Sequence, residues 1–376
     1  MRSETSSIEK SLKVDARAFK QQIAFNKPTF SKKELKSVLE CMVQDEITFG
    51  NVVLNFEKEL ASAFEFQKAI TTISLSSAYH LALMSFDIKE NDEIILAANS
   101  PVAALDAVHY LKAKPVLVDI AQNSFNASDE LIIEKITAKT KAIILFHAYG
   151  AYQNHQLLFD FLKTDENAAE IKLIEDISYL AGAEDDTGFV GNSADIAISG
   201  LHEDMIMTIG KGAVLFTNSK NIYASAKDLR MHGGKKAYRV RYDYTIPDYQ
   251  AAMGLEQLGQ LTNIINRRRK IGSLYKETIS ESRLQTWFQD SEIDTFGAFP
   301  VVFDKPVDTV KAFFQSRNID CRKTMVYGPL GNLIGEPASS FPNAEKLYQR
   351  GLLLPLYPNL TKINIERLIT AIRSYH

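Results

Sequence analysis

The stretch that decides the fold is EIILAANSPVAALDAVHYLKAKPVLVDI, residues 93–120. It begins and ends with short apolar runs, and between them apolar residues recur three and four positions apart, which is the spacing of one helix face. Short runs that are apolar throughout are typical of strands in a sheet that helices cover on both sides. The stretch therefore predicts a strand, a helix and a second strand of an α/β sheet.

The same alternation extends from about residue 68 to residue 217. Four further apolar runs, KAIILFHA, IKLIED, DIAIS and AVLFT, start at positions 141, 171, 195 and 213. Between the runs lie helical stretches with serine or aspartate near their starts, where these residues cap helices. The pattern predicts a three-layer α/β/α domain with a mainly parallel sheet.

We expect three parts along the chain. Residues 1–20 are polar and are expected to be loose. Residues 21–250 are expected to form the large α/β domain with an N-terminal helical arm. Residues 246–278 have the pattern of one long amphipathic helical region, so residues 251–376 are expected to hold a connector helix and a smaller α+β domain.

Composition argues against several classes of partner. The chain has 43 basic and 46 acidic residues, so no positive excess indicates nucleic acid or an anionic membrane. No apolar run approaches the ~20 residues of a membrane span, and the N-terminus lacks the apolar core of a signal peptide. We therefore expect a cytoplasmic protein. Cys41 and Cys321 fit neither a disulfide framework nor a zinc site, and no metal site is expected.

Several stretches, in their order and spacing, resemble the DegT/StrS family of pyridoxal-phosphate-dependent nucleotide-sugar aminotransferases. They include ITFGNVVLNFEKELA at 47–61, IEDISYLAGAE at 174–184, KGAVLFTNSK at 211–220 and LLLPLYPNLT at 352–361. The resemblance covers nearly the whole chain. It implies the fold-type-I aminotransferase architecture and a homodimer with active sites at the subunit interface.

The resemblance places Asp204 where the family has its catalytic lysine. The family motif Ser-Phe-His-Pro-x-Lys corresponds to SGLHED at 199–204, and a shift by one residue gives Glu203 or Met205. None of these side chains forms an imine with pyridoxal phosphate (PLP), as the lysine must do. Lys211, the nearest lysine downstream, is expected in the turn before the next strand.

Three polar residues match cofactor-binding positions of the family. Asp176 corresponds to the aspartate that keeps the pyridine nitrogen protonated, and Ser199 and Ser76 correspond to residues that bind the phosphate. Asp176 and Ser199 also have an ordinary structural interpretation, since aspartate and serine are common in the loops that follow strands.

Four other positions depart from the family pattern. Leu75 replaces the glycine that lets the backbone approach the phosphate. Asp243 replaces an asparagine that reaches the phosphate across the subunit boundary, and Pro101 replaces the aromatic residue that stacks on the ring. Tyr179 replaces a glutamine, and its bulk is expected to close the cavity.

Polar residues outside the cofactor motif suggest where a substrate binds. His147 and Tyr149 follow a strand, at the edge of the sheet where ligands of α/β proteins gather, although a surface position is equally compatible with them. Arg230 and His232, and the run Arg267–Arg269, are expected to be solvated.

The combined changes lead to the hypothesis of a non-catalytic relative of the sugar aminotransferases with no bound cofactor. It would bind a sugar nucleotide as a homodimer, or pair with an active paralogue in a heteromer. The alternative is an active PLP-dependent nucleotide-sugar aminotransferase, or a 3-dehydratase-like enzyme, in surface-polysaccharide or deoxyamino-sugar biosynthesis.

Overall fold

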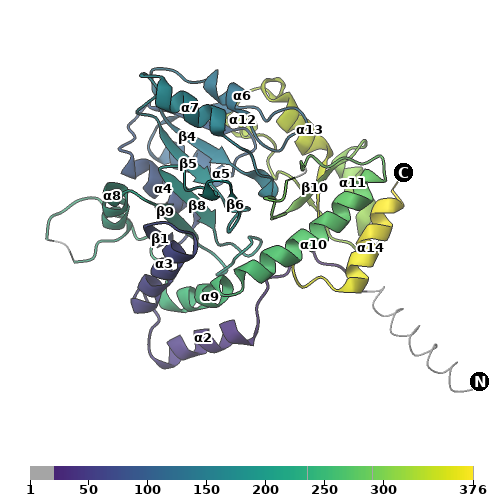
Figure 1. Ribbon diagram of the computed structural model, residues 1–376, viewed down its shortest axis with the longest axis horizontal. Helices are drawn as coiled ribbons and strands as arrows, with labels where there is room; N and C mark the ends of the chain where they lie inside the picture. The colour runs from purple at the N-terminus through teal and green to yellow at the C-terminus, as the bar shows by residue number, and fades with distance from the viewer. Residues whose placement is uncertain (1–20, 235, 290, 376) are drawn as a thin grey trace, which may run out of the picture.

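The computed structural model describes residues 21–234, 236–289 and 291–375 (Figure 1). The prediction that residues 1–20 are loose lies outside them. The described residues form a large unit around a central sheet and a smaller unit at the far end of a long helix. The predicted α/β fold, with a mainly parallel sheet and a smaller α+β part, is confirmed.

The central sheet of the described residues has seven strands. In order across the sheet they are β1 (Lys68–Thr72), β9 (Ala213–Thr217), β8 (Ile196–Gly200), β5 (Lys172–Asp176), β4 (Thr140–Phe146), β2 (Glu93–Ala97) and β3 (Lys114–Val118). Neighbours from β8 to β3 are parallel, whereas β9 is antiparallel to both β8 and β1. Along β2, Ile94 and Leu96 belong to one apolar cluster and Ile95 and Ala97 to another, because successive strand side chains point to opposite faces.

Helices cover both faces of this sheet (Figure 1). On the Ile94 face lie α4 (Leu75–Ser85), α5 (Val102–Tyr110) and α8 (Lys220–Arg230); on the Ile95 face lie α6 (Asp129–Ile133) and α7 (Gln156–Thr164). Serine caps begin three of these helices, as predicted, because a hydroxyl oxygen accepts a backbone N–H that the first turn leaves free. The capping residues are Ser74, Ser128 and Ser219.

The N-terminal arm consists of α2 (Lys32–Val43) and α3 (Asn51–Ala63), which pack against α9 (Asp248–Leu258). Asp248 closes the start of α3: its Oδ1 accepts the backbone N–H of Gly50 and of Val53, both at 2.9 Å. The cap of α3 therefore comes from a residue that is almost 200 positions away in the sequence.

The connector differs from the prediction of a single helix. The structure has two helices, α9 and α10 (Leu261–Ser280), which are separated at Gly259 and Gln260. Gln260 precedes the first residue of α10, with φ −110° and ψ 0°, and its Nε2 donates to Glu34 Oε1 of α2 at 3.1 Å. This contact lies at the break, where α9 packs on the arm and α10 runs on to the small unit (Figure 1).

The small unit is built around a three-stranded antiparallel sheet. Its elements are β10 (Phe299–Val302), β12 (Gly351–Leu354), β11 (Arg322–Lys323), α11 (Val307–Gln315), α13 (Pro342–Arg350) and α14 (Lys362–Arg373). Ile23 also joins this unit, because its N–H donates to Asn318 O at 2.8 Å and its carbonyl accepts Asp320 N–H at 2.9 Å. A domain boundary at residue 250 stays a prediction.

Shorter elements complete the described chain. They are β6 (Glu184–Asp185), β7 (Gly188–Phe189), α12 (Gly331–Ile334) and the 3-10 helices η1 (Ala148–Gly150) and η2 (Ala338–Ser340). Across residues 21–375, as far as they are described, none of the helices is both long enough and apolar enough to span a bilayer.

The prediction that Arg267–Arg269 form a solvated face is wrong. Arg268 is 2% exposed, and its Nη1 donates to the carbonyls of Phe296, Gly297 and Leu356 at 3.3, 2.9 and 3.0 Å. Burial lowers its pKa to about 10. Irregular buried backbone leaves carbonyls without partners, and a guanidinium offers five donors for them. Arg267 and Arg269 also donate to carbonyl oxygens of loops.

Candidate functional site

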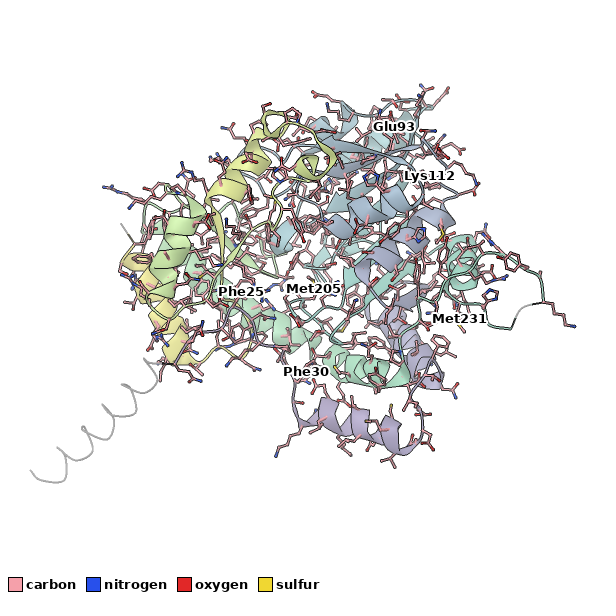
Figure 2. The ribbon with its side chains drawn as sticks, turned by 180° about the vertical axis from the view of Figure 1, so that it is seen from behind. Phe25, Phe30, Glu93, Lys112, Met205 and Met231 are labelled. Atoms are coloured by element: carbon pink, nitrogen blue, oxygen red, sulfur yellow. The ribbon has the colours of Figure 1, made fainter. Side chains whose placement is uncertain are left out.

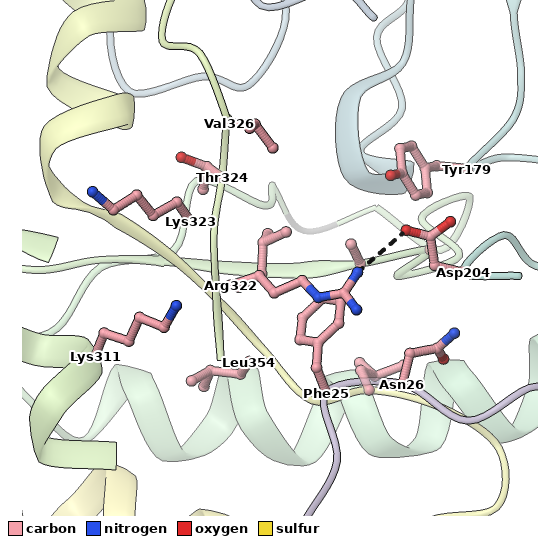
Figure 3. Close-up of a pocket in the computed structure, with 14 residues that line it drawn as sticks. Phe25, Asn26, Tyr179, Asp204, Lys311, Arg322, Lys323, Thr324, Val326 and Leu354 are labelled. Atoms are coloured by element: carbon pink, nitrogen blue, oxygen red, sulfur yellow. Dashed lines mark ion pairs between the residues drawn. The ribbon is translucent and has the colours of Figure 1, made fainter. Parts of the chain in front are cut away.

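A cavity of ≈ 410 Å³ lies between the large unit, the small unit and the N-terminal segment. Tyr179 and Asp204 contribute to its wall from the large unit, Phe25 and Asn26 from the N-terminal segment, and Arg322 and Thr324 from the small unit (Figure 3). Phe25 and Met205, the neighbour of Asp204, are labelled at this border in Figure 2. The cavity thus brings together segments that are far apart in the sequence.

Asp204 lies on the loop between β8 and β9, and its carboxylate faces Arg322 across the cavity (Figure 3). The Oδ2 to Nη1 distance is 4.0 Å, and the side chains are 35% and 53% exposed, so a ligand can reach both. The guanidinium of Arg322 lies 4.5 Å from the ring centre of Phe25. Nearby, burial lowers the pKa of His202. Lys211 is exposed in the turn before β9, as predicted.

Asp176 ends β5 and is fully buried. Its Oδ2 accepts a hydrogen bond from the Tyr79 hydroxyl, and its Oδ1 accepts the Ser178 N–H at 2.8 Å. Burial raises the pKa of this carboxyl group. Asp176 does not line the cavity, and both its oxygens already have donors. A pyridine N–H would have to compete with the Tyr79 phenol.

The N-terminus of α4 is closed by its own side chains. Ser77 N–H donates to Ser74 Oγ at 3.1 Å, and Ser74 N–H donates to Ser77 Oγ at 3.0 Å. Leu75 is buried in the first turn beside Ser76. Ser199 Oγ is buried, and no described residue forms a hydrogen bond with it. The backbone N–H of Ser77, which could otherwise bind a phosphate, therefore already has an acceptor. The side chain of Leu75 stands where the family has a glycine.

Tyr179 lines this cavity, whereas Asp176, Ser76 and Ser199 do not, so the expectation that the bulk of Tyr179 closes the cofactor cavity stays a prediction. Gly297 makes room for the tyrosine, because a Cβ atom at that position would lie 2.7 Å from Tyr179 Cβ. Burial first, and the charge of Asp204 second, raise the pKa of Tyr179. Its hydroxyl thus stays protonated and points into the cavity (Figure 3).

The other two altered positions lie outside the cavity wall. Pro101 precedes the first residue of α5. Asp243 is exposed on the segment before α9, and its Oδ1 accepts the Thr245 hydroxyl at 3.3 Å. The resemblance predicts that Asp243 acts on a second subunit, and this stays a prediction.

His147 and Tyr149 are buried, so a surface position is wrong for both. His147 Nδ1 accepts the Gln153 N–H at 3.3 Å, which leaves its Nε2–H to donate to Glu175 Oε1 at 2.7 Å. The hydroxyl of Tyr149 donates to the carbonyl of Thr324 at 3.0 Å, and Thr324 lines the cavity. Tyr149 supports the cavity wall from behind, and substrate contact by either residue stays a prediction.

The expectation of a solvated Arg230 is also wrong, whereas His232 is exposed. Arg230 is 1% exposed, forms an ion pair with Glu57 of α3 and donates to the carbonyl of Thr71 at 3.1 Å. Glu57 also accepts the N–H and the hydroxyl of Thr71, both at 2.8 Å. A buried carboxylate needs a cation, and the end of α8 supplies it.

Sequence reasoning missed the half of the cavity wall that comes from the small unit and the N-terminal segment. Arg322 lies on the two-residue strand β11, Lys311 lies on α11, and Phe25 and Asn26 precede the arm. None of them belongs to a motif, and no spacing pattern distinguishes Arg322 from the other arginines of the chain.

The sequence identifies the family. A sequence model of the DegT/DnrJ/EryC1/StrS aminotransferase family matches residues 28–373. The chain belongs to this family. This DegT/DnrJ/EryC1/StrS family member is 27% identical over 358 residues to the GDP-perosamine synthase of Escherichia coli O157:H7, with 93% of this chain and 97% of that protein covered.

Solved aminotransferases share the fold of this family member. The PLP form of the putative sugar aminotransferase Spr1654 from Streptococcus pneumoniae superposes with a TM-score of 0.86 at 20% identity, covering 94% of this chain and 98% of that one. The aminotransferase TlmJ from Streptoalloteichus hindustanus gives 0.85 at 22% identity, with coverage of 94% and 98%. The predicted fold-type-I transferase architecture is confirmed.

The family depends on PLP, but the residues at the predicted cofactor positions of this member do not fit the imine-bound group. Asp204 offers a carboxylate in place of an amine. Asp176 is occupied by Tyr79, and Leu75 stands in the first turn of α4, which is closed by its own cap. No reaction step through PLP follows from this arrangement.

Proposed function

We propose that this chain is a non-catalytic member of the DegT/DnrJ/EryC1/StrS family, which binds a nucleotide sugar between its two units and forms no imine with PLP. The observation that carries the proposal is the Asp204 carboxylate, which faces the cavity and Arg322. An imine lysine at this position would bring its cation toward the guanidinium, whereas an aspartate is attracted to it.

The surroundings of Asp176 and of α4 support the same proposal. The phenol of Tyr79 and the capping box of Ser74 and Ser77 satisfy groups that a cofactor ring and phosphate would otherwise use. Buried polar groups need hydrogen-bond partners. Here the side chains of Tyr79 and Ser74 are the partners, for the Asp176 carboxylate and the Ser77 N–H.

The class of ligand is inferred from a relative. The E. coli protein with 27% identity over 93% of this chain is named a GDP-perosamine synthase, and perosamine is there carried on a nucleoside diphosphate. A nucleotide sugar is therefore the ligand class we propose. A cytoplasmic location and a homodimer, or a heteromer with an active paralogue, stay predictions.

The test is an absorbance titration with PLP, followed by borohydride reduction and mass analysis of the intact chain, alongside calorimetry with GDP-mannose. We expect no reduced adduct, no saturable cofactor band and measurable binding of the nucleotide sugar. Asp204→Lys reports whether the pocket accepts PLP once an amine is present. An adduct in the unaltered chain would contradict the proposal.

Two observations favour an active PLP enzyme as the second candidate. Asp176 keeps its carboxylate at the end of β5, and the Ser199 Oγ is buried with no partner among the described residues. A band of bound PLP at one per chain without an adduct would support this candidate, and a dehydratase-like reaction would then be the one to assay.

A further inference from the structure

We infer that the cavity recognises a sugar that carries both an amine and a phosphate, as an amino-sugar nucleotide does, with the ammonium group at Asp204 and the phosphate at Arg322 and Lys311. The inference rests on the proposed function and specifies its ligand. It follows from the distribution of charge and of free hydrogen-bonding groups around the cavity.

The two sides of the cavity differ in charge. Asp204 is the one carboxylate among the lining residues, whereas the small unit contributes Lys311, Arg322 and Lys323 (Figure 3). Lys323 is neutralised by Asp308, at 2.9 Å, outside the cavity. The charges that remain are those of Lys311 and Arg322 on the side of the small unit and that of Asp204 on the side of the large unit. Because two positive charges face one negative charge, the cavity has a net positive charge. A ligand with a net negative charge complements this distribution.

The cations on the small-unit side have binding capacity left. The side chain of Arg322 makes no hydrogen bond with the described residues, and its one ion pair, with Asp204, is 4.0 Å long. Lys311 has no carboxylate within ion-pair distance in the described part of the chain. A guanidinium binds phosphate oxygens in pairs, and an ammonium adds a point charge. Together they form a site for a phosphate group.

The large-unit side suits a protonated amine. The Asp204 side chain lines the cavity and is 35% exposed, and the Tyr179 hydroxyl lies beside it (Figure 3). Asn26 is fixed next to them, because its Nδ2 donates to the carbonyl of Glu203 at 2.7 Å. A carboxylate prefers an ammonium group to a hydroxyl or a carbonyl, because the hydrogen bond then joins opposite charges. The position predicted for the imine lysine would therefore bind an amine without reacting with it.

The net positive charge argues against a free amino acid as the main ligand. Glutamate carries one ammonium and two carboxylate groups, so its net charge is a single negative charge. A sugar diphosphate brings more negative charge to Lys311 and Arg322. We therefore keep glutamate as a competing probe in the experiment.

The experiment is calorimetry on the full chain with glucosamine 1-phosphate and glucose 1-phosphate, which differ only in an amine against a hydroxyl. We expect glucosamine 1-phosphate to bind about tenfold more tightly, the size of one hydrogen bond between charged groups. Asp204→Asn keeps the shape and removes the charge, so it should bring the two affinities within about twofold. Arg322→Gln should weaken both probes by a similar factor.

Lys58→Gln is the matched control, because it removes an exposed cation of α3 that does not line the cavity, and both affinities should stay close to those of the unaltered chain. Equal binding of the two probes by the unaltered chain, or discrimination that survives in Asp204→Asn, would overturn the inference. Binding of glutamate but of neither sugar phosphate would overturn it as well.

The same measurements separate this inference from the proposed function. If GDP-mannose binds and neither sugar phosphate does, the chain recognises other parts of the nucleotide sugar. The inference about Asp204, Arg322 and Lys311 is then wrong, and the proposed function stands. If neither GDP-mannose nor the sugar phosphates bind, the proposed function and the inference are both wrong. A borohydride-reduced PLP adduct removes the proposed function, whatever the sugar phosphates do.

Discussion

Charged side chains inside this protein are held by partners from distant segments. Arg230 at the end of α8 meets Glu57 of α3 and the carbonyl of Thr71 of β1, and its guanidinium lies 4.7 Å from the ring centre of Phe49. Removing one member of such a pair leaves the other charged and buried, which costs more than the pair itself contributes.

We expect Arg230→Met to lower the free energy of unfolding by about 3–5 kcal/mol, because Glu57 would keep only the Thr71 donors. Urea unfolding followed by circular dichroism measures this. Arg239→Met is the control, since Arg239 is 54% exposed in its pair with Asp228 and should change stability by less than about 1 kcal/mol. Equal effects of the two substitutions would contradict the argument.

His80 is a second residue whose environment predicts a measurable effect. It is 5% exposed, its Nδ1 lies 3.0 Å from the Tyr244 hydroxyl, and the rings of Tyr110 and Tyr242 pack edge-on against it. Burial lowers its pKa to about 4. The folded protein thus keeps His80 neutral at pH values where the unfolded chain protonates it.

Stability should therefore be lost as the pH falls from about 6.5 to about 4, by roughly 3 kcal/mol from His80 alone. Thermal unfolding between pH 7 and pH 4.5 measures the loss. His80→Gln keeps a hydrogen-bond acceptor without the titration, so its unfolding temperature should fall less over the same range. Parallel pH profiles for the two proteins would show that His80 does not contribute.

At the scale of elements, helix ends in this chain depend on side chains from other elements as well as on local caps. The local caps Ser31, Ser74 and Thr361 are of the kind that sequence predicts. The cap of α3 could not be predicted from the local sequence, because Gly50 at its N-terminus has no side chain and the capping carboxylate comes from Asp248 at the start of α9. The capping hydrogen bonds join the N-terminal arm to the connector.

Asp248→Ala should lower the free energy of unfolding by about 1–2 kcal/mol, because two N–H groups of α3 lose their acceptor and the helix N-terminus loses a negative charge. Asp248→Asn keeps an acceptor oxygen and should cost less. Chemical unfolding of the two variants decides this, and an Asn variant no more stable than the Ala variant would mean that the capping bonds contribute little.

At the scale of the whole molecule, the outer face of α2 predicts a second subunit. Leu35, Leu39, Met42 and Val43 recur at helical spacing and are 61%, 51%, 57% and 82% exposed. The opposite face of the helix packs on α9. An apolar helix face of this kind is typical of a protein interface.

We expect light scattering to give twice the mass of one chain, and the double variant Leu39→Glu, Met42→Glu to give the mass of a single chain, because charge at the centre of an apolar interface is costly. Leu333→Glu changes an exposed leucine elsewhere and should leave the dimer intact. A monomeric unaltered chain would refute the dimer, and added paralogue would then test the heteromer.

The strands and most helices could be predicted from the sequence, because period-2 and period-3.6 patterns are local and each strand lies between two helical layers. The six apolar runs from residue 93 to residue 217 all form strands at those places. The antiparallel position of β9 and the break at Gly259 could not be predicted, because they depend on which elements pack against them.

The sequence by itself determined the family, the fold and the aspartate at position 204. Only the tertiary structure decided what Asp204 faces, since Arg322 lies more than a hundred residues away and belongs to no motif. The same holds for Arg230, whose partner Glu57 is 173 positions away. Local patterns specify which groups a chain has, but the environment of a charge depends on through-space contacts, and these exist only once the units have packed.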